Sequence, residues 1–496
     1  MNQIPVTQQT LQLIHAAFAN PMQPDPNALA KIFAQATGLV QYDLQAPAKI
    51  IYPVLTPFRN WIQRVPANGG TATHWKAITG INIANLSPGV GEGKRGGLIV
   101  TTLVDRLAAF KTLGFEDAVT LQADWAAKGF DDPKARAVEG LLRSLMVGEE
   151  KIMWGGNTSL ALGKTPTPNV TASNAGGSLG TQVWSVICVA LTPEGYYNSS
   201  VAAGLPGQIT RTSPIGEVDT YGGGNAQRSD AATGEVTAGS SGSLAVTVAI
   251  VKGAAAYAWY WGAAGAEKLG AITTMNSINI TGVAAGTQTS EVVAAADYST
   301  NGLIYDGLIT QDLLPNSGAY YAALATGTAG TGTPLTSNGQ GGIAEFDAAF
   351  RYWWDNYRLS PDECWVAAQQ LIDINKLVIA NGGAPLIRFN LDAARPDSTI
   401  DAGIVVGTIL NPITNTKVKV AVHPNAVPGT VKFICRQVPY KLSNVGNLIE
   451  FRYRSDYYQL EWPRRTNSYE YGVYADGTLL NFFPPAGGVI TNIAPA

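Results

Sequence analysis

The clearest regularity in the chain is a helical pattern between residues 133 and 154. Apolar residues recur there every three or four positions and form one broad stripe, made up of Val138, Leu141, Leu142, Leu145, Met146, Ile152 and Met153. Asp131 and Asp132 stand where capping residues are favoured, Pro133 suits a first turn, and a glycine pair beginning at Gly155 ends the pattern. At a rise of ~1.5 Å per residue the helix would span roughly 33 Å, which suits a structural spine.

Two segments ahead of this helix, residues 73–84 and 97–104, have the composition of β-strands. The connection between them, residues 85–96, is rich in glycine and carries Lys94 and Arg95. We therefore expect a long hairpin with a flexible, basic tip. Such a hairpin has little around it to bury against, so we expect a neighbouring subunit to cover it.

Composition changes between residues 164 and 296, where Gly, Ala, Ser and Thr dominate and charges are few. Short strands separated by turn signals are predicted at 182–190, 244–251, 255–261 and 277–281. This spacing is typical of a β-sandwich of immunoglobulin or fibronectin type, with Trp184, Trp259 and Trp261 as core candidates. We interpret the segment as an inserted domain.

Helical periodicity returns after residue 298. Ile343, Phe346, Phe350, Trp353, Trp354 and Tyr357 share one face of a predicted helix. A ligand platform is the alternative interpretation of this aromatic stripe, but core packing is the commoner cause. A second helix is predicted to follow at once, with Ser360 as N-cap, Pro361 in the first position, Glu363 completing a capping box, and its end at 381–383.

The two ends of the chain differ in their predicted structure. Strands are expected in the C-terminal part at 417–422, 432–437, 448–454, 469–474 and 478–483. Residues 1–60 instead indicate an extended arm with two short helices, at 8–18 and 27–37, separated by the proline-rich run 20–26.

Composition and charge exclude several classes of protein. The chain has 496 residues, a formal net charge of -3 and only 14% charged residues. We therefore expect two to four substructures and no DNA-wrapping role of the cationic kind. Cys188, Cys364 and Cys435 lie in apolar runs, which predicts buried, reduced thiols. The first residues lack a secretory signal, and no run of about eighteen apolar residues occurs, so neither secretion nor a membrane span is predicted.

Two formal motifs lack the context that their chemistry needs. The glycines at 91, 93 and 96 match a dinucleotide-binding pattern but lie between two predicted strands and open no helix. Ser178 stands in a G-x-S-x-G pattern without a preceding strand to form an elbow. The three histidines, His15, His74 and His423, are scattered along the chain, and no Cys or His pair has metal-ligand spacing. We therefore predict no catalytic site, no metal and no cofactor.

Two acidic pairs have residue types that suit general acid and base chemistry. Asp131 and Asp132 are explained by the start of a helix. Glu149 and Glu150 are explained by a solvated helix face.

This order of parts resembles the Hong Kong 97-type fold of the major capsid proteins of tailed double-stranded-DNA bacteriophages. The arm, the hairpin and the long helix come first, Gly302–Gln311 looks like the re-entry into an axial-type domain, and Tyr471–Phe483 closes a peripheral-type sheet. Immunoglobulin-like insertions occur among such proteins. The implied class is α+β, with an all-β sandwich inserted in the capsid fold. The expected divisions are an arm at 1–60, an extended hairpin loop at 61–112, a peripheral domain with the spine helix at 113–164, the sandwich at 165–296, an axial-type domain at 297–420, and a peripheral-type sheet with the C-terminus at 421–496.

The resemblance also implies a function. Such a protein assembles with itself into hexamers and pentamers, and these form an icosahedral shell around the phage DNA. Scaffold, portal and decoration proteins are possible further partners, DNA contact is non-specific, and no membrane is involved. Assembly in the host cytoplasm and a place in the virion are expected.

The tip of the hairpin is the predicted intersubunit contact. Glu92, Lys94 and Arg95 lie there among glycines, and the two cations indicate an acidic patch on a neighbour. The main alternative is a phage or bacterial surface adhesin or carbohydrate-binding protein in which the sandwich carries the function. An enzyme is the third option, but no nucleophile, base and orienting group can be assembled from these motifs.

Overall fold

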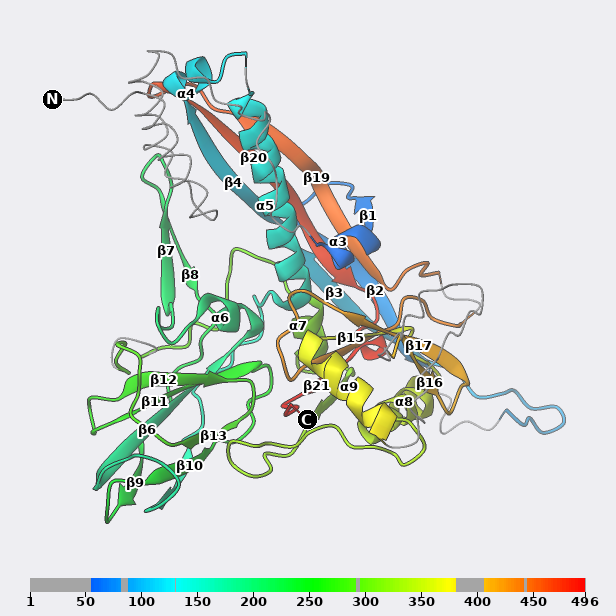
Figure 1. The fold of residues 1–496 in the computed structure, drawn as a ribbon. Helices are drawn as coiled ribbons and strands as arrows, with labels where there is room; N and C mark the ends of the chain where they lie inside the picture. The colour runs from blue at the N-terminus through cyan, green and yellow to red at the C-terminus, as the bar shows by residue number, and fades with distance from the viewer. Residues whose placement is uncertain are drawn as a thin grey trace, which may run out of the picture. The chain divides into compact units, whose positions relative to one another are not determined.

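The computed structural model describes residues 55–81, 88–129, 131–290, 295–380, 406–440 and 444–495 (Figure 1). At four of these positions, 79, 81, 379 and 380, it describes the backbone but not the side chain. The arm helices predicted at 8–18 and 27–37 and the helix end predicted at 381–383 lie outside these residues. Helices and mostly antiparallel sheets occupy separate stretches of the described chain, so the α+β class is confirmed.

The predicted spine helix is confirmed as α5 (Pro133–Gly155). Its N-terminal cap is also as predicted, because the Asp132 carboxylate accepts a hydrogen bond from the Lys134 N–H at 3.0 Å. Leu141, Leu145 and Met153 of the apolar stripe are buried. Residues 120–134 belong to a different compact unit from residues 54–119 and 135–496. That unit holds the short helix α4 (Leu121–Ala126), capped by Thr120.

A four-stranded sheet in the order β1-β19-β20-β4 contains the longest strands of the described chain. The strands of this sheet are β1 (Gln63–Pro66), β4 (Lys111–Thr120), β19 (Ile449–Glu461) and β20 (Ser468–Asn481), of which β19 and β20 are the longest. In Figure 1 the strands β4, β19 and β20 run along α5. The separate strands predicted at 469–474 and 478–483 were wrong, because β20 runs through both. Gly477 makes no turn there. A Cβ on it would lie 2.5 Å from the Phe451 ring, so its lack of a side chain permits close packing within the sheet.

A six-stranded sheet in the order β14-β21-β18-β15-β17-β16 joins distant parts of the sequence. Its strands are β14 (Tyr320–Ala323), β15 (Glu363–Val366), β16 (Thr408–Asn411), β17 (Thr416–Val422), β18 (Val431–Ile434) and β21 (Gly488–Thr491). Helices α7 (Leu308–Leu313), α8 (Ala344–Tyr357) and α9 (Ala368–Ala380) accompany them, with a 3-10 turn at Pro484–Ala486. Strands from both sides of the division expected at residue 420 therefore share one sheet.

Helix α8 confirms most of the predicted aromatic face. Phe346, Phe350 and Trp353 are buried, and each ring lies within 6.0 Å of the Phe433 ring of β18, centroid to centroid. Trp354 departs from the prediction, because 39% of its surface is exposed. The Arg358 guanidinium lies over its ring at 5.7 Å.

The predicted start of the second helix was wrong. Ser360 and Pro361 cap no helix, and Glu363 begins the strand β15, which pairs with β17 and β18. The helix α9 begins only at Ala368. Tertiary contacts explain the difference. Residues Cys364 to Val366 are fully buried between β17 and β18, and this pairing overrides the local capping signal.

The segment 165–296 forms two facing sheets, ordered β13-β10-β5 and β12-β11-β6-β9. The four predicted strands are present as β6 (Gln182–Leu191), β10 (Ser243–Thr247), β11 (Ala256–Gly262) and β13 (Ser277–Ile280). Three further strands, β5 (Asn169–Ser173), β9 (Ala232–Val236) and β12 (Lys268–Thr273), were not among those predicted. Trp184, Trp259 and Trp261 are buried in its core, as predicted. A separate ribbon, β7 (Gln208–Thr212) with β8 (Val218–Gly222), and the short helix α6 (Pro193–Asn198) complete it. The immunoglobulin type of the sandwich stays a prediction.

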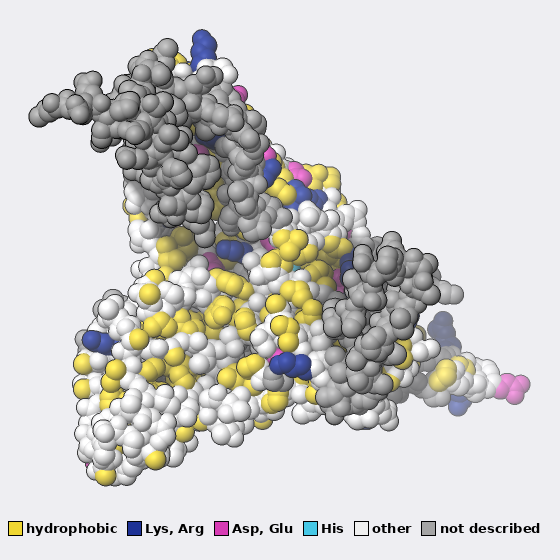
Figure 2. Space-filling view, viewed as in Figure 1, with side chains coloured by type: hydrophobic (Ala, Val, Ile, Leu, Met, Phe, Trp, Pro, Cys, Tyr) yellow, Lys and Arg dark blue, Asp and Glu magenta, His cyan; other side chains and the backbone are white. Residues whose placement is uncertain are grey.

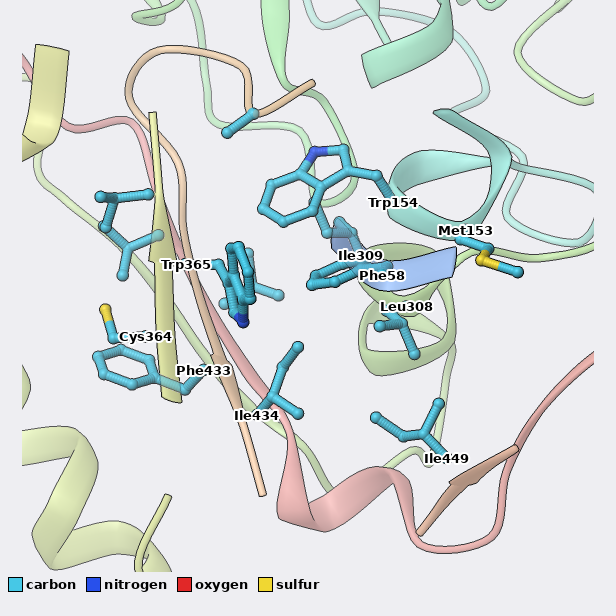
Figure 3. Packing of buried hydrophobic residues seen from close by; sticks show 14 of the residues in the cluster. Phe58, Met153, Trp154, Leu308, Ile309, Cys364, Trp365, Phe433, Ile434 and Ile449 are labelled. Atoms are coloured by element: carbon cyan, nitrogen blue, oxygen red, sulfur yellow. The ribbon is translucent and has the colours of Figure 1, made fainter. Parts of the chain in front are cut away.

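The main core lies where the helices meet the six-stranded sheet (Figure 3). Phe58 from the short helix α3 (Pro57–Trp61) packs against Trp154 of α5 and Trp365 of β15, with ring centroids 5.6 and 5.0 Å away. Cys188, Cys364 and Cys435 are buried and form no disulfide, as predicted. Burial raises the pKa of all three thiols.

Candidate intersubunit surface

The predicted hairpin consists of β2 (Ala72–Ile81) and β3 (Thr101–Ala109), paired antiparallel. Ile78 lies opposite Leu103, and Leu107 lies on the same face because residues two apart on a strand point to the same side. All three side chains are exposed. Between them lies the ion pair Lys76–Asp105, with 3.8 Å between its charged atoms and both side chains mostly exposed. One face of the hairpin is therefore an uncovered apolar surface with a charged pair in it.

The exposed surface continues beyond the strands into residues 88–100, the tip segment. These residues have no regular secondary structure and all are exposed. Val90, Ile99 and Val100 are apolar and exposed, and Leu98 is 90% exposed. Figure 1 draws the segment as the pale blue loop at the right, and Figure 2 shows apolar, acidic and basic side chains together there. Exposed apolar runs of this kind are typical of interaction surfaces, so the tip segment is a candidate for one.

Glu92, Lys94 and Arg95, the predicted contact residues, lie together in the tip segment. They make no ion pair with another residue that the structure describes. The structure thus brings the three charges onto one loop, and their contact with a neighbouring subunit stays a prediction.

The other end of the hairpin is fixed to the protein. The Trp75 ring packs edge-on against Phe482 at 5.7 Å, and the Arg454 guanidinium lies over Phe110 at 5.3 Å. A cavity of about 400 Å³ lies beside this base, lined by Trp75, Arg106, Lys111 and residues from the ranges 304–317 and 478–484. The hairpin is therefore anchored at its base, while its far end has no support from the described chain.

A buried polar joint connects α3 to the spine helix and the six-stranded sheet. The Glu150 carboxylate of α5 accepts hydrogen bonds from the Phe58 and Arg59 N–H groups at 2.9 and 2.8 Å. His423, at the end of β17, lies 2.7 Å from the same carboxylate through Nε2, and both side chains are fully buried. The Trp154 ring stacks on the imidazole at 4.3 Å. This arrangement fixes three elements at one point.

The hydrogen bonds around His423 select its neutral form. The Asn425 N–H donates to Nδ1 at 3.1 Å, so Nδ1 is an acceptor and the proton is on Nε2, facing Glu150. Burial lowers the pKa of His423, and the Glu150 carboxylate only partly opposes this. His423 is therefore a structural group, a role that its isolated position in the sequence does not indicate.

A second buried carboxylate lies next to this joint. Glu149 pairs with Arg64 at 3.0 Å, and the Tyr457 hydroxyl donates to it. Arg64 also binds Asp456 at 2.6 Å. Burial lowers the pKa of Arg64, but Glu149 and Asp456 together hold it above its ordinary value.

The interpretation of Glu149 and Glu150 as a solvated helix face was wrong, because both are fully buried. The partners of Glu149 are Arg64 and Tyr457. The partners of Glu150 are Phe58, Arg59 and His423, and all five residues are far away in the sequence. The single available signal was their position on the apolar side of the helix, between Leu145 and Met153.

The residues of the formal catalytic and nucleotide-binding motifs lie in loops, turns and strands where they form no reactive site within the described chain. The glycines at 91, 93 and 96 lie in the tip segment, which opens no helix. Ser178 donates to the Thr281 carbonyl oxygen at 3.0 Å in a turn of the sandwich. His74 is exposed on β2, while His423 is buried. Nowhere in the described ranges do three or more His, Cys, Asp or Glu side chains gather as a metal site requires. The described helices also include none long and apolar enough to cross a lipid bilayer.

Comparison with known sequences gave no match, either to a protein-family model or to a curated protein.

Chains similar to this one occur in solved structures of capsids and of an encapsulin complex. The capsid of a native GTA particle is similar with a TM-score of 0.45 and 8% identity, over 93% of this chain and 99% of that one. The capsid of cyanophage A-1(L) gives a TM-score of 0.42 and 10% identity, over 92% and 98%. The encapsulin SrpI complex of Synechococcus elongatus gives a TM-score of 0.39 and 8% identity, over 93% and 96%.

Proposed function

We propose that this chain is a capsid shell subunit, the major capsid protein of a tailed double-stranded-DNA bacteriophage. The observation that carries the proposal is the hairpin with its tip segment. Ile78, Leu103 and Leu107 on its face, and Leu98 at its end, are apolar side chains that the described chain leaves 56 to 90% exposed. A two-stranded hairpin is marginal in water by itself. A second copy of the chain is the partner that would cover it in every subunit alike.

The rest of the described fold supplies the rigid frame that a lattice subunit needs. Helix α5 has 23 residues and β20 has 14, so both are long elements. The Glu150–His423 joint fixes α5 to α3 and β17, and Glu149 fixes α5 to Arg64 of β1 and Tyr457 of β19 with little exposure to water. A buried network with satisfied partners resists local opening. Contacts made at the hairpin would therefore be transmitted to a body that keeps its shape.

The shell would consist of hexamers and pentamers enclosing double-stranded DNA. Assembly would take place in the host cytoplasm, and scaffold, portal and decoration proteins would be the further partners. The formal net charge of -3 suits a container for DNA, because dense basic contacts would hold the polyanion in place. The proposed role includes no catalytic step and no cofactor.

Size-exclusion chromatography and negative-stain microscopy of the purified protein test the proposal. We expect hexamers, pentamers, shells or tubes. Changing Leu98, Ile99 and Val100 together to Ser should leave the subunit folded but unassembled, because the change removes apolar contact area and no internal contact. Val283→Ser is the matched control, since Val283 is exposed in the sandwich. A wild-type protein that stays monomeric at high concentration, with and without co-expressed phage proteins, would refute the proposal.

A further inference from the structure

Lys432 and Asp312 are in direct contact inside the main core. Lys432 lies on β18 and is 1% exposed, and Asp312 lies on α7 and is fully buried. The lysine is on an inner strand of the six-stranded sheet, opposite Val489 of β21 on one side and Trp365 of β15 on the other. Its Nζ meets Oδ2 of a residue 120 positions earlier in the chain. The tertiary fold alone brings the two groups together.

The pair is poorly satisfied as an ion pair. An ammonium group has three N–H donors and a carboxylate has two oxygens. Within the described residues, Nζ has Asp312 as its one hydrogen-bond partner, and Oδ1 of Asp312 has none. Leu308, Ile309 and Leu313 of α7 are buried apolar neighbours in the same helix. Two buried charges are favourable when their remaining donors and acceptors are also paired, and here they are not.

Burial shifts both groups toward their uncharged forms. Burial raises the pKa of Asp312 to about 6 against the opposing effect of Lys432. Burial likewise lowers the pKa of Lys432 against the opposing effect of Asp312. Transfer of one proton within the pair gives a free amine next to a carboxylic acid, and a free amine is a nucleophile.

We propose that Lys432 and Asp312 condense into an amide bond between Nζ and Cγ. The amine lone pair forms the N–C bond, the bond from Cγ to the hydroxyl oxygen breaks, and the hydroxyl leaves as water with a proton from the nitrogen. No electrons are gained or lost, and no other reactant takes part. The product carries one N–H and one carbonyl in place of two incompletely paired charges.

The backbone around the pair leaves room for this geometry. A Cβ on Gly487 would lie 2.4 to 2.8 Å from three atoms of the Asp312 carboxyl group, so the absence of a side chain there makes the space that the carboxyl occupies. Groups held in contact inside a folded protein react as if present at ~10⁵–10⁸ M. The bond would tie α7 to β18 and close residues 312–432 into a covalent loop. This inference does not depend on the proposed function.

The intact mass of the denatured wild-type protein tests the inference directly. We expect it to be lower than the sequence mass by one water molecule, and a partial fraction should increase on incubation of the folded protein. Lys432→Arg should have its full mass, because the guanidinium does not condense. Asp312→Asn should lose ammonia in place of water and reach the same final mass as the wild type, since the amide product is identical.

A second measurement covers the case in which a variant folds poorly. Limited proteolysis of the folded wild type within residues 312–432 should give pieces that stay joined on a reducing denaturing gel, and peptide mapping should find the segments around residues 312 and 432 linked. A wild-type protein with its full sequence mass after prolonged incubation, whose pieces separate on the gel, would overturn the inference and leave an ordinary buried ion pair.

Discussion

At the scale of single residues, we expect the buried carboxylate of Glu150 to have a large effect on stability. It satisfies two backbone N–H groups of α3 and the Nε2–H of His423. Glu150→Ala would leave all three donors buried without an acceptor, so we expect a loss of roughly 3 kcal/mol in the free energy of unfolding. Urea denaturation of the unassembled subunit would measure it.

The matched control for this change is Glu139→Ala on the same helix. Glu139 pairs with Arg143 one turn away, and both side chains are substantially exposed. A surface pair of this kind contributes about 0.5 kcal/mol or less. Similar losses for the two variants would show that the buried joint does not stabilise the fold.

His423 gives the stability a defined dependence on pH. Its pKa in the folded protein is lowered below 6.5, so the unfolded chain binds the proton more readily than the folded one. The stability associated with the neutral imidazole is therefore complete above about pH 6.5 and is lost as the pH falls through the folded pKa. The groups facing the ring are the Glu150 carboxylate, the Asn425 N–H and the rings of Phe58, Trp154 and Trp365.

We expect the melting temperature of the wild type to fall between about pH 7 and about pH 5 more steeply than that of His423→Gln. Glutamine retains a donor toward Glu150 but does not titrate. Parallel pH profiles for the two proteins would contradict the assignment.

At the scale of elements, the tip segment is where charge should affect assembly. Its glycines are conformationally permissive, so we expect that ordering it against a neighbour costs about 1 to 2 kcal/mol per residue in backbone entropy. One exposed ion pair contributes only ~0.2 to 1 kcal/mol, but a shell repeats the contact in every subunit. We therefore expect the double variant Lys94→Glu with Arg95→Glu to assemble more slowly or to form shells that melt at lower temperature, with an unchanged subunit fold.

The control reverses two exposed lysines on a strand, Lys417 and Lys419 of β17. It makes the same change in net charge away from the tip. Equal assembly yields and equal shell melting temperatures for the two double variants would show that Lys94 and Arg95 make no contact with a neighbouring subunit.

At the scale of the whole molecule, the sandwich segment is predicted to be separable. Its two ends meet, because the Gly163 N–H donates to the Asp297 carboxylate at 2.7 Å and Asn157 donates to the Ser299 carbonyl at 2.8 Å. A short Gly/Ser linker in place of residues 164–296 would therefore span the gap. We expect the shortened protein to assemble, as seen by microscopy.

The structure also predicts a cost for this deletion. Asn276 of the segment forms buried hydrogen bonds with Asn492, next to β21, at 2.9 and 3.0 Å. Removing the segment exposes Asn492, so we expect a lower melting temperature than that of the full chain. Complete loss of soluble protein would show that the sandwich belongs to the core and that its predicted boundary is wrong.

The sequence by itself determined the elements whose signals are local. The stripe and caps of α5, the strands of the hairpin, and the buried tryptophans of the sandwich all follow from spacing within about twenty residues. Periodicity reflects which side of an element faces water, so it predicts an element without knowledge of its neighbours.

Only the tertiary structure decided the features that depend on partners far away in the sequence, namely one strand and several buried charged side chains. Cys364–Val366 is a strand and not a helical turn because β17 and β18 lie on either side of it. Glu150 is buried because His423 and the N–H groups of α3 donate hydrogen bonds to it. Lys432 is buried in contact with the carboxylate of Asp312, which lies 120 residues earlier in the sequence. Burial of a polar group costs desolvation free energy that a hydrogen-bond or ion-pair partner must offset. When that partner is far away in the sequence, the local pattern of hydrophobic and polar residues does not predict the burial.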